Sequence, residues 1–243
     1  MRWAPRARGR TAVSPVVSTI VITAALLMIL VVATALASSM LEVHLQNLEF
    51  EQAKTTMMAL SKVIEEVSLR LGAASSLQFS QRRGGIGVYE GEAITVRVYN
   101  GSECVLSISN ATYVLKYRGG SMALAAPMDL SGSGGLIVEA PKPLAYVRVE
   151  VGGGAWIVID YNRVSVLNNP SLDTVDAFLI LLRPGTFGGT GIVTVKVQNK
   201  YVKSWSCEGD KIVVKVGDRE DSLPLGGLRN IRVTEVVVEV SVM

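Results

Sequence analysis

The sequence predicts an α+β protein in which one long N-terminal helix, transmembrane plus stalk, is followed by an antiparallel β-sandwich-like domain. Three observations support this prediction. An uncharged apolar run spans Val13 to Ala37, an apolar stripe at helical spacing continues to Leu71, and alternation with period two begins at Leu77. The predicted order is a basic leader (1–12), a transmembrane helix (13–37), an amphipathic helical stalk (38–71), a linker (72–86) and an extracellular β-sandwich domain (87–243).

The apolar run is long enough to cross a membrane. Its 25 residues would span roughly 37 Å as a helix, against a hydrocarbon core of about 30 Å. Four arginines between Arg2 and Arg10 precede it, whereas glutamates from Glu42 to Glu51 outnumber Lys54 after it. The positive-inside rule therefore places the N-terminus in the cytoplasm and the C-terminal domain outside. The alternative is a secretory signal cleaved at "ALASS", but the run exceeds the usual apolar region of about 7 to 15 residues.

The helix is expected to continue beyond the membrane. Ser14 before Pro15 is typical of a helix start, and Gly72 after Leu71 of a helix end. We expect the membrane-distal part of the stripe to pack on the β-domain of its own chain and the nearer part to pack on the helix of a neighbouring subunit. The stripe consists of Leu41, Leu45, Leu48, Met57, Leu60, Ile64 and Val67, with Ala53 and Leu71 on the same face.

The remainder of the chain has the alternation of strands with one wet face. The clearest segments are "AITVRVYN", "LAYVRVEV", "GIVTVKVQNK" and "KIVVKVG", separated by glycine-rich breaks. In the C-terminal segment "NIRVTEVVVEVSVM" the apolar positions change from odd (Ile231, Val233) to even (Val236, Val238). We therefore expect a β-bulge near Thr234 or Glu235. So long an apolar strand should be central in its sheet or covered by the helix stripe.

Composition and motifs give little support for catalysis. The only histidine, His44, lies on the predicted stalk, so the β-domain can build neither a Ser-His-Asp triad nor a His-ligated metal site. The glycine-rich "GGIGVYEG" is expected to be a turn rather than a dinucleotide loop, and "GDRED" a charged hairpin turn rather than a calcium loop. We expect no enzyme activity, cofactor or metal. A surface hydrolase using Asp173 and Asp176 is the least favoured alternative.

Charge and modification sites suit an external domain. The formal net charge of +3 is modest, and no basic block occurs beyond the N-terminus, so nucleic-acid binding is not expected. Cys104 and Cys207 both lie on the proposed outer side, where a disulfide would persist; two free thiols are the equal alternative. The sequons at Asn100 ("NGS") and Asn110 ("NAT") are candidate N-glycosylation sites.

The N-terminus combines a short basic leader, an apolar segment and a long helix. The leader with Arg8-Gly9 is followed by "AVSPVVSTIVITA" and by an apolar helix that runs past the membrane. This arrangement resembles the N-terminus of archaeal type IV pilins and pilin-like proteins. The resemblance covers residues 8 to about 71. It implies a class III signal cut by a prepilin peptidase on the cytoplasmic side, which leaves the apolar helix on the mature protein.

The leader departs from the family pattern and leaves two cut positions. Cleavage after Gly9 would leave Arg10 at the new N-terminus, where its charge would have to enter the apolar filament core. Alignment on "VSPVV" places the cut between Ala12 and Val13, and this position is preferred.

Two functions are carried forward. The first is a structural subunit of an archaeal type IV pilus-like surface filament, with the membrane and other pilin subunits as partners. Small residues spaced four apart, such as Ser14 with Ser18, would let such helices approach closely. The alternative is a monomeric, membrane-anchored extracellular binding or adhesion domain that recognises a surface glycan or another cell-surface target. In that case Tyr146, Trp156 and Trp205 could form its binding face.

Overall fold

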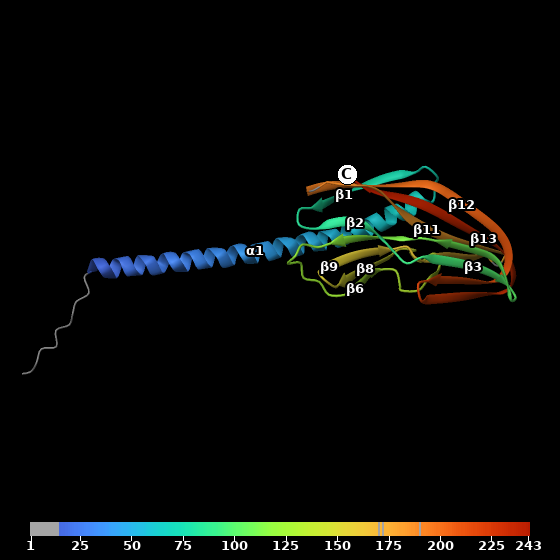
Figure 1. Cartoon of the computed structure of the whole chain (residues 1–243), viewed down its shortest axis with the longest axis horizontal. Helices are drawn as coiled ribbons and strands as arrows, with labels where there is room; N and C mark the ends of the chain where they lie inside the picture. Colours follow the sequence, from blue (N-terminus) through green and yellow to red (C-terminus); the bar gives the residue numbers. More distant parts are fainter. Residues whose placement is uncertain (1–14, 170, 172, 190) are drawn as a thin grey trace, which may run out of the picture. The chain divides into compact units, whose positions relative to one another are not determined.

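The computed structural model describes residues 15–169, 171, 173–189 and 191–243. The chain divides into two compact units, residues 1–45 and 46–243. The second unit contains the C-terminal part of helix α1 and the β-strands of two sheets (Figure 1). The predicted α+β class, with one long apolar helix before a β-sheet domain, is confirmed. The leader residues Gly9, Arg10, Ala12 and Val13 lie outside the described residues.

Helix α1 (Pro15–Ser68) is continuous for 54 residues. All side chains from Val16 to Leu41 are exposed, and this part is long and apolar enough to cross a membrane. The helix ends three residues before the predicted Leu71. Gly72 does adopt the left-handed conformation expected of a helix-terminating glycine (φ 77°), and its N–H donates to the Asn199 carbonyl (3.2 Å).

The C-terminal part of α1 lies in the core of the second unit. Met57, Leu60 and Ile64 are fully buried, in one cluster with residues of both sheets. These buried positions belong to the predicted apolar stripe, and the structure adds Phe50 to them. Leu71 does not belong to this buried stripe. Its surface is 68% exposed, because the helix has already ended and the chain has turned toward β1 (Ala74–Gln81).

The larger sheet has eight strands among the described residues, with β13 between β12 and β11. Most pairs are antiparallel, but β13 runs parallel to β11 and β10 parallel to β7, so the sandwich is mixed rather than wholly antiparallel. The strands are β1 (Ala74–Gln81), β3 (Ile94–Asn100), β4 (Glu103–Asn110), β7 (Ile137–Glu139), β10 (Val164–Asn169), β11 (Thr174–Phe187), β12 (Gly191–Val216) and β13 (Arg219–Val242).

The smaller sheet has five strands in the described part of the chain, in the order β2-β5-β9-β8-β6. One face packs on α1, and two tyrosine hydroxyls reach the helix from it. The Tyr117 hydroxyl donates to Glu49 Oε1 (3.3 Å) and the Tyr161 hydroxyl to the Ser61 carbonyl (2.7 Å). The strands are β2 (Gly85–Glu90), β5 (Tyr113–Arg118), β6 (Met128–Ser131), β8 (Tyr146–Val151) and β9 (Ala155–Asp160).

The predicted bulge near Thr234 is wrong. β13 keeps an unbroken register with β11 from Asn230 to Val240. Its even positions, such as Val236 and Val238, join the core around the helix, whereas Ile231 and Val233 join a second core on the opposite face. The apolar positions therefore change from odd to even because the two faces of the strand pack in two different cores. The prediction that this strand is central is confirmed, and its even face also packs with the helix.

Two further segments differ from the predictions. Residues 72–86 are not a linker, because β1 within them pairs antiparallel with β12. The "GGIGVYEG" segment is not a turn, because it contains strand β2. The "GDRED" turn is confirmed: Val216 pairs with Arg219 across a two-residue hairpin at Gly217 and Asp218. The segments "GIVTVKVQNK" and "KIVVKVG" are parts of one strand, β12, which curves together with β13 (Figure 1).

Candidate functional site

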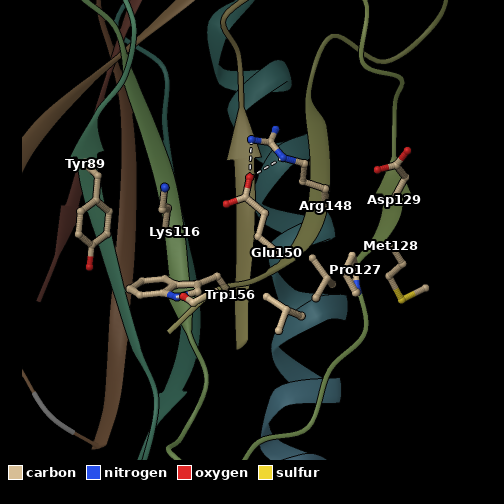
Figure 2. Close-up of a pocket in the computed structure, with 11 residues that line it drawn as sticks. Tyr89, Lys116, Pro127, Met128, Asp129, Arg148, Glu150 and Trp156 are labelled. Atoms are coloured by element: carbon tan, nitrogen blue, oxygen red, sulfur yellow. Dashed lines mark hydrogen bonds and ion pairs between the residues drawn. The ribbon is translucent and has the colours of Figure 1, made fainter. Parts of the chain in front are cut away.

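A groove of about 880 Å³ lies on the outer face of the five-stranded sheet, opposite the face that packs on the helix. One row of directly paired residues crosses all five strands here: Gly87, Lys116, Val158, Arg148 and Asp129. Because side chains alternate along each strand, these residues share the outer face. The six side chains that matter for the groove's chemistry are Tyr89, Lys116, Asp129, Arg148, Glu150 and Trp156 (Figure 2).

Two aromatic rings form one end of the groove. Tyr89 and Trp156 meet edge to face, with centroids 6.0 Å apart and planes at 88°. The Trp156 indole N–H donates to the Gly152 carbonyl (3.2 Å), which fixes the ring, and the Arg118 guanidinium lies 5.5 Å from its centroid. Gly87 allows this arrangement, since a Cβ there would lie 3.1 Å from the Tyr89 ring. The rings are therefore held in place, although 44% of Tyr89 is exposed.

The other end is charged, and most of its charges are already paired. Arg148 donates to Glu150 (2.7 Å) and makes a longer contact to Asp160 (3.4 Å). Burial alone would lower the pKa of Arg148, but these two carboxylates raise it overall. The Tyr146 hydroxyl donates to Asp129 (2.6 Å), and this hydrogen bond raises the pKa of Tyr146. Arg148 is consequently a fixed cation with its own counter-ions.

Lys116 differs from these groups. Its side chain is half-buried on β5, and among the described residues it forms no hydrogen bond or ion pair. Lys116 and Arg148 also line a second hollow of about 570 Å³, which continues on their other side toward Asn162 and Arg219. The two hollows share these two cations as a common wall.

The buried side chain of Arg163 packs against Tyr146, which borders the groove. Its guanidinium lies 4.9 Å from the centroid of the Tyr146 ring, and Arg148 is at the same distance from that ring. Burial lowers the pKa of Arg163. Its Nη1 donates to the Ser133 carbonyl, whereas its buried Nε has no hydrogen-bond partner among the described residues. The Tyr146 ring is thus held by two cations and one carboxylate.

Of the three aromatics predicted for a binding face, Trp156 lines the groove, and Tyr146 borders it through its hydrogen bond to Asp129. Tyr146 and Trp156 lie on this face of the sheet, but Trp205 lies on β12 and packs against the second core. Alternation placed Tyr146, Arg148 and Glu150 on one polar face. Tyr89 and Lys116 were not predicted, because they meet this face only through pairing of β2 with β5 and of β5 with β9.

The predicted modification sites are separate from the groove. Both cysteines are free thiols: Cys104 is exposed on β4, and Cys207 is partly buried on β12, where burial raises its pKa. Asn100 is exposed at the end of β3. Asn110 instead donates to the buried Glu235 carboxylate (2.7 Å), so a glycan on Asn110 would break this contact.

The two carboxylates of the hydrolase alternative form salt bridges. Asp173 pairs with Arg229, and Asp176 with Arg232 (2.7 Å). His44 is exposed on the helix. Within the described ranges, no group of three or more His, Cys, Asp or Glu residues could hold a metal ion.

The second functional surface is the apolar side of α1. Leu41 and Leu45 in the first unit, and Leu48 in the second, remain exposed, with 66% of Leu48 uncovered. The membrane-distal members of the stripe, Met57 and Ile64, are fully buried within their own chain. The stripe is therefore covered in one half only.

Comparison with protein-family models, with curated proteins and with solved structures finds no match to this chain.

Proposed function

We propose that this protein is a structural subunit of an archaeal type IV pilus-like surface filament. In this proposal the leader is removed by a prepilin peptidase, and the apolar helix anchors the chain in the membrane before assembly. The β-domain then faces the outside. The other subunits of the filament are copies of the same chain or related pilins.

The continuity of α1 is the observation that carries the proposal. One unbroken helix has an exposed apolar part, from Val16 onward, and a part that forms the core of a β-domain. The same helix can therefore serve both as a subunit of a helical bundle and as a core element of the β-domain. The exposed apolar surface also continues past the first charge, Glu42, to Leu45 and Leu48. Such a surface needs a cover, and neighbouring helices would supply it.

The alternative function is a monomeric membrane-anchored binding domain, and the groove on the five-stranded sheet favours it. Both functions use the helix as an anchor, but only the filament requires contacts between helices of different subunits. Substitutions on the exposed stripe therefore separate them.

Leu45→Glu is the test of the filament. The variant should reach the membrane and fold, because Leu45 lies outside the buried core, but it should form no filaments, since a charge would face the neighbouring helix. Gln52→Glu is the matched control, because it places the same charge at an exposed polar position of the same helix. Electron microscopy of sheared surface fibres gives the readout, and the fibre subunit should begin at Val13 or Arg10 by mass spectrometry. Normal filaments from Leu45→Glu would show that the helix is only a tether.

A further inference from the structure

We propose that the groove on the five-stranded sheet binds an acidic saccharide, a glycan whose sugar rings carry carboxylates. One of the two perpendicular rings of Tyr89 and Trp156 would stack on the apolar face of a sugar ring, the other would contact its edge, and Lys116 would pair with the carboxylate. This role is additional to filament assembly, and neither role requires the other.

The aromatic end offers two fixed rings at right angles to each other. Tyr89 stands over Gly87, and Trp156 is fixed by its bond to the Gly152 carbonyl, so neither ring has to be ordered on binding. Preorganised rings avoid the entropic cost that flexible side chains incur. The exposed part of the rings is an apolar surface beside polar groups, which matches a sugar ring with its C–H face and its hydroxyls.

Lys116 is the group in the groove that favours an acidic ligand. Glu150 and Asp160 already neutralise Arg148, and Asp129 accepts the Tyr146 hydroxyl proton. Lys116 is the cation of the groove without a partner among the described residues, and Figure 2 shows it between Tyr89 and the Arg148–Glu150 pair. A carboxylate that enters beside the rings would therefore find Lys116. Glu150 and Asp129 remain close enough to accept hydrogen bonds from sugar hydroxyls.

The position of the groove favours a saccharide over a peptide. The groove extends across the strands, because residues of all five strands, from Tyr89 on β2 to Asp129 on β6, line it. Under its central part the strands β5, β9 and β8 are paired on both sides, and only β2 and β6 at its two ends are edge strands. An extended peptide normally gains affinity by pairing its own backbone with a sheet edge. A saccharide needs only side-chain hydrogen bonds and a stacking surface, and the groove offers both.

The test uses the full-length protein in detergent micelles, titrated with an α-1,4-linked galacturonate tetramer and followed by isothermal calorimetry. The neutral galactose tetramer with the same linkage and a tetraglutamate peptide are the comparison probes. We expect saturable binding of the galacturonate tetramer, weaker binding of the neutral tetramer and weaker binding of the peptide. Because the protein is kept unassembled, the result does not depend on filament formation.

Two variants assign the roles. Tyr89→Ala should weaken binding by up to about tenfold, for both saccharides alike. Lys116→Gln should weaken binding of the galacturonate tetramer by about fivefold and leave the neutral tetramer unchanged. Tyr201→Ala and Lys215→Gln are matched controls on β12, outside the groove, and should bind as the parent protein does. Circular dichroism on each variant verifies the fold.

Three results would overturn the proposal. The first is an absence of saturable galacturonate binding to the parent protein. The second is equal affinity for the acidic and neutral tetramers together with no effect of Lys116→Gln. The third is preferential binding of tetraglutamate, which would assign the groove to an acidic peptide.

Discussion

Single polar residues connect strands that are distant in the sequence, and Glu235 is the clearest case. It lies in the middle of β13 with 2% of its surface exposed, and Asn110 at the end of β4 donates to its carboxylate. A buried carboxylate requires such donors, because desolvation otherwise destabilises its charged form. The same Asn110 lies in a sequon, so the amide that a glycan would modify already donates to a buried carboxylate.

Asn110→Ala should lower the free energy of unfolding by about 1 to 3 kcal/mol, because it leaves the buried Glu235 carboxylate without this donor. Asn100→Ala is the matched control. It changes the same residue type in the other sequon, but at an exposed position, and its effect should stay within about 0.5 kcal/mol. Urea unfolding of both variants gives the comparison. Equal free energies of unfolding for the two variants would show that the Asn110–Glu235 contact does not stabilise the domain.

At the scale of elements, the end of α1 depends on a residue from β12. The last four carbonyls of a helix lack intrahelical donors. The Asn199 side-chain amide lies 3.1 Å from the carbonyls of both Ser68 and Arg70, and 3.4 Å from that of Val67. Its own backbone N–H donates to Ala73 (2.9 Å), next to the register shift on β12. Asn199 follows Val193, Val195 and Val197 on the same face of β12, and this alternation places its buried amide against the helix terminus.

Asn199→Leu should destabilise the domain by about 1 to 3 kcal/mol, since it keeps a similar volume but removes the donors of several helix carbonyls. Asn168→Leu on β10 controls for the same exchange at an exposed position and should change stability little. Hydrogen exchange should also be faster in the last turn of α1 for Asn199→Leu. Unchanged exchange in this turn would mean that water or other groups satisfy these carbonyls equally well.

The strand patterns show which elements the sequence can predict. Segments with one wet face and one core face were predicted well, because side-chain alternation reports burial: Val96 and Val147 point into cores as expected. β1, "ASSLQFSQ", was assigned to a linker, because its place is set by backbone pairing with β12 and not by its polar side chains. The predicted bulge in β13 is wrong because it assumes that all apolar residues of the strand face one core. Val233 and Val236 face two different cores.

Only part of the candidate groove can be predicted from the sequence, for a related reason. The polar face with Tyr146, Arg148 and Glu150 follows from alternation along a single strand. Its completion by Tyr89 and Lys116 depends on which strands are neighbours, and this comes from the order β2-β5-β9-β8. Strand order depends on long-range pairing, which no local pattern encodes. The long helix, by contrast, needed only local periodicity and length, and it was predicted nearly to its ends.

At the scale of the whole molecule, tyrosines couple the helix to the smaller sheet. The buried hydroxyls of Tyr117 and Tyr161 contact α1 at Glu49 and at Ser61, which fixes the helix along its axis as well as against the sheet. Burial raises the pKa of both tyrosines, with a further contribution from Glu49 for Tyr117 and from Glu65 for Tyr161. The domain should therefore lose stability in alkaline solution.

Tyr161→Phe tests this coupling through its pH dependence. A folded-state pKa above the unfolded value of about 10 stabilises the fold fully below pH 10, and this contribution is lost as pH rises, because the unfolded tyrosine ionises first. At pH 8 the variant should be less stable by about 1 kcal/mol, since the hydrogen bond to the Ser61 carbonyl is absent. Between pH 8 and pH 11 the parent protein should lose about 1.4 kcal/mol more than the variant, about 1 kcal/mol of it above pH 10, so the stability advantage of the parent at pH 8 should disappear by pH 11. Urea unfolding at pH 8, 10 and 11 measures them, with Tyr201→Phe at an exposed position of β12 as the control. A stability difference between parent and Tyr161→Phe that stays constant from pH 8 to 11 would mean that the hydroxyl is not shielded by the helix.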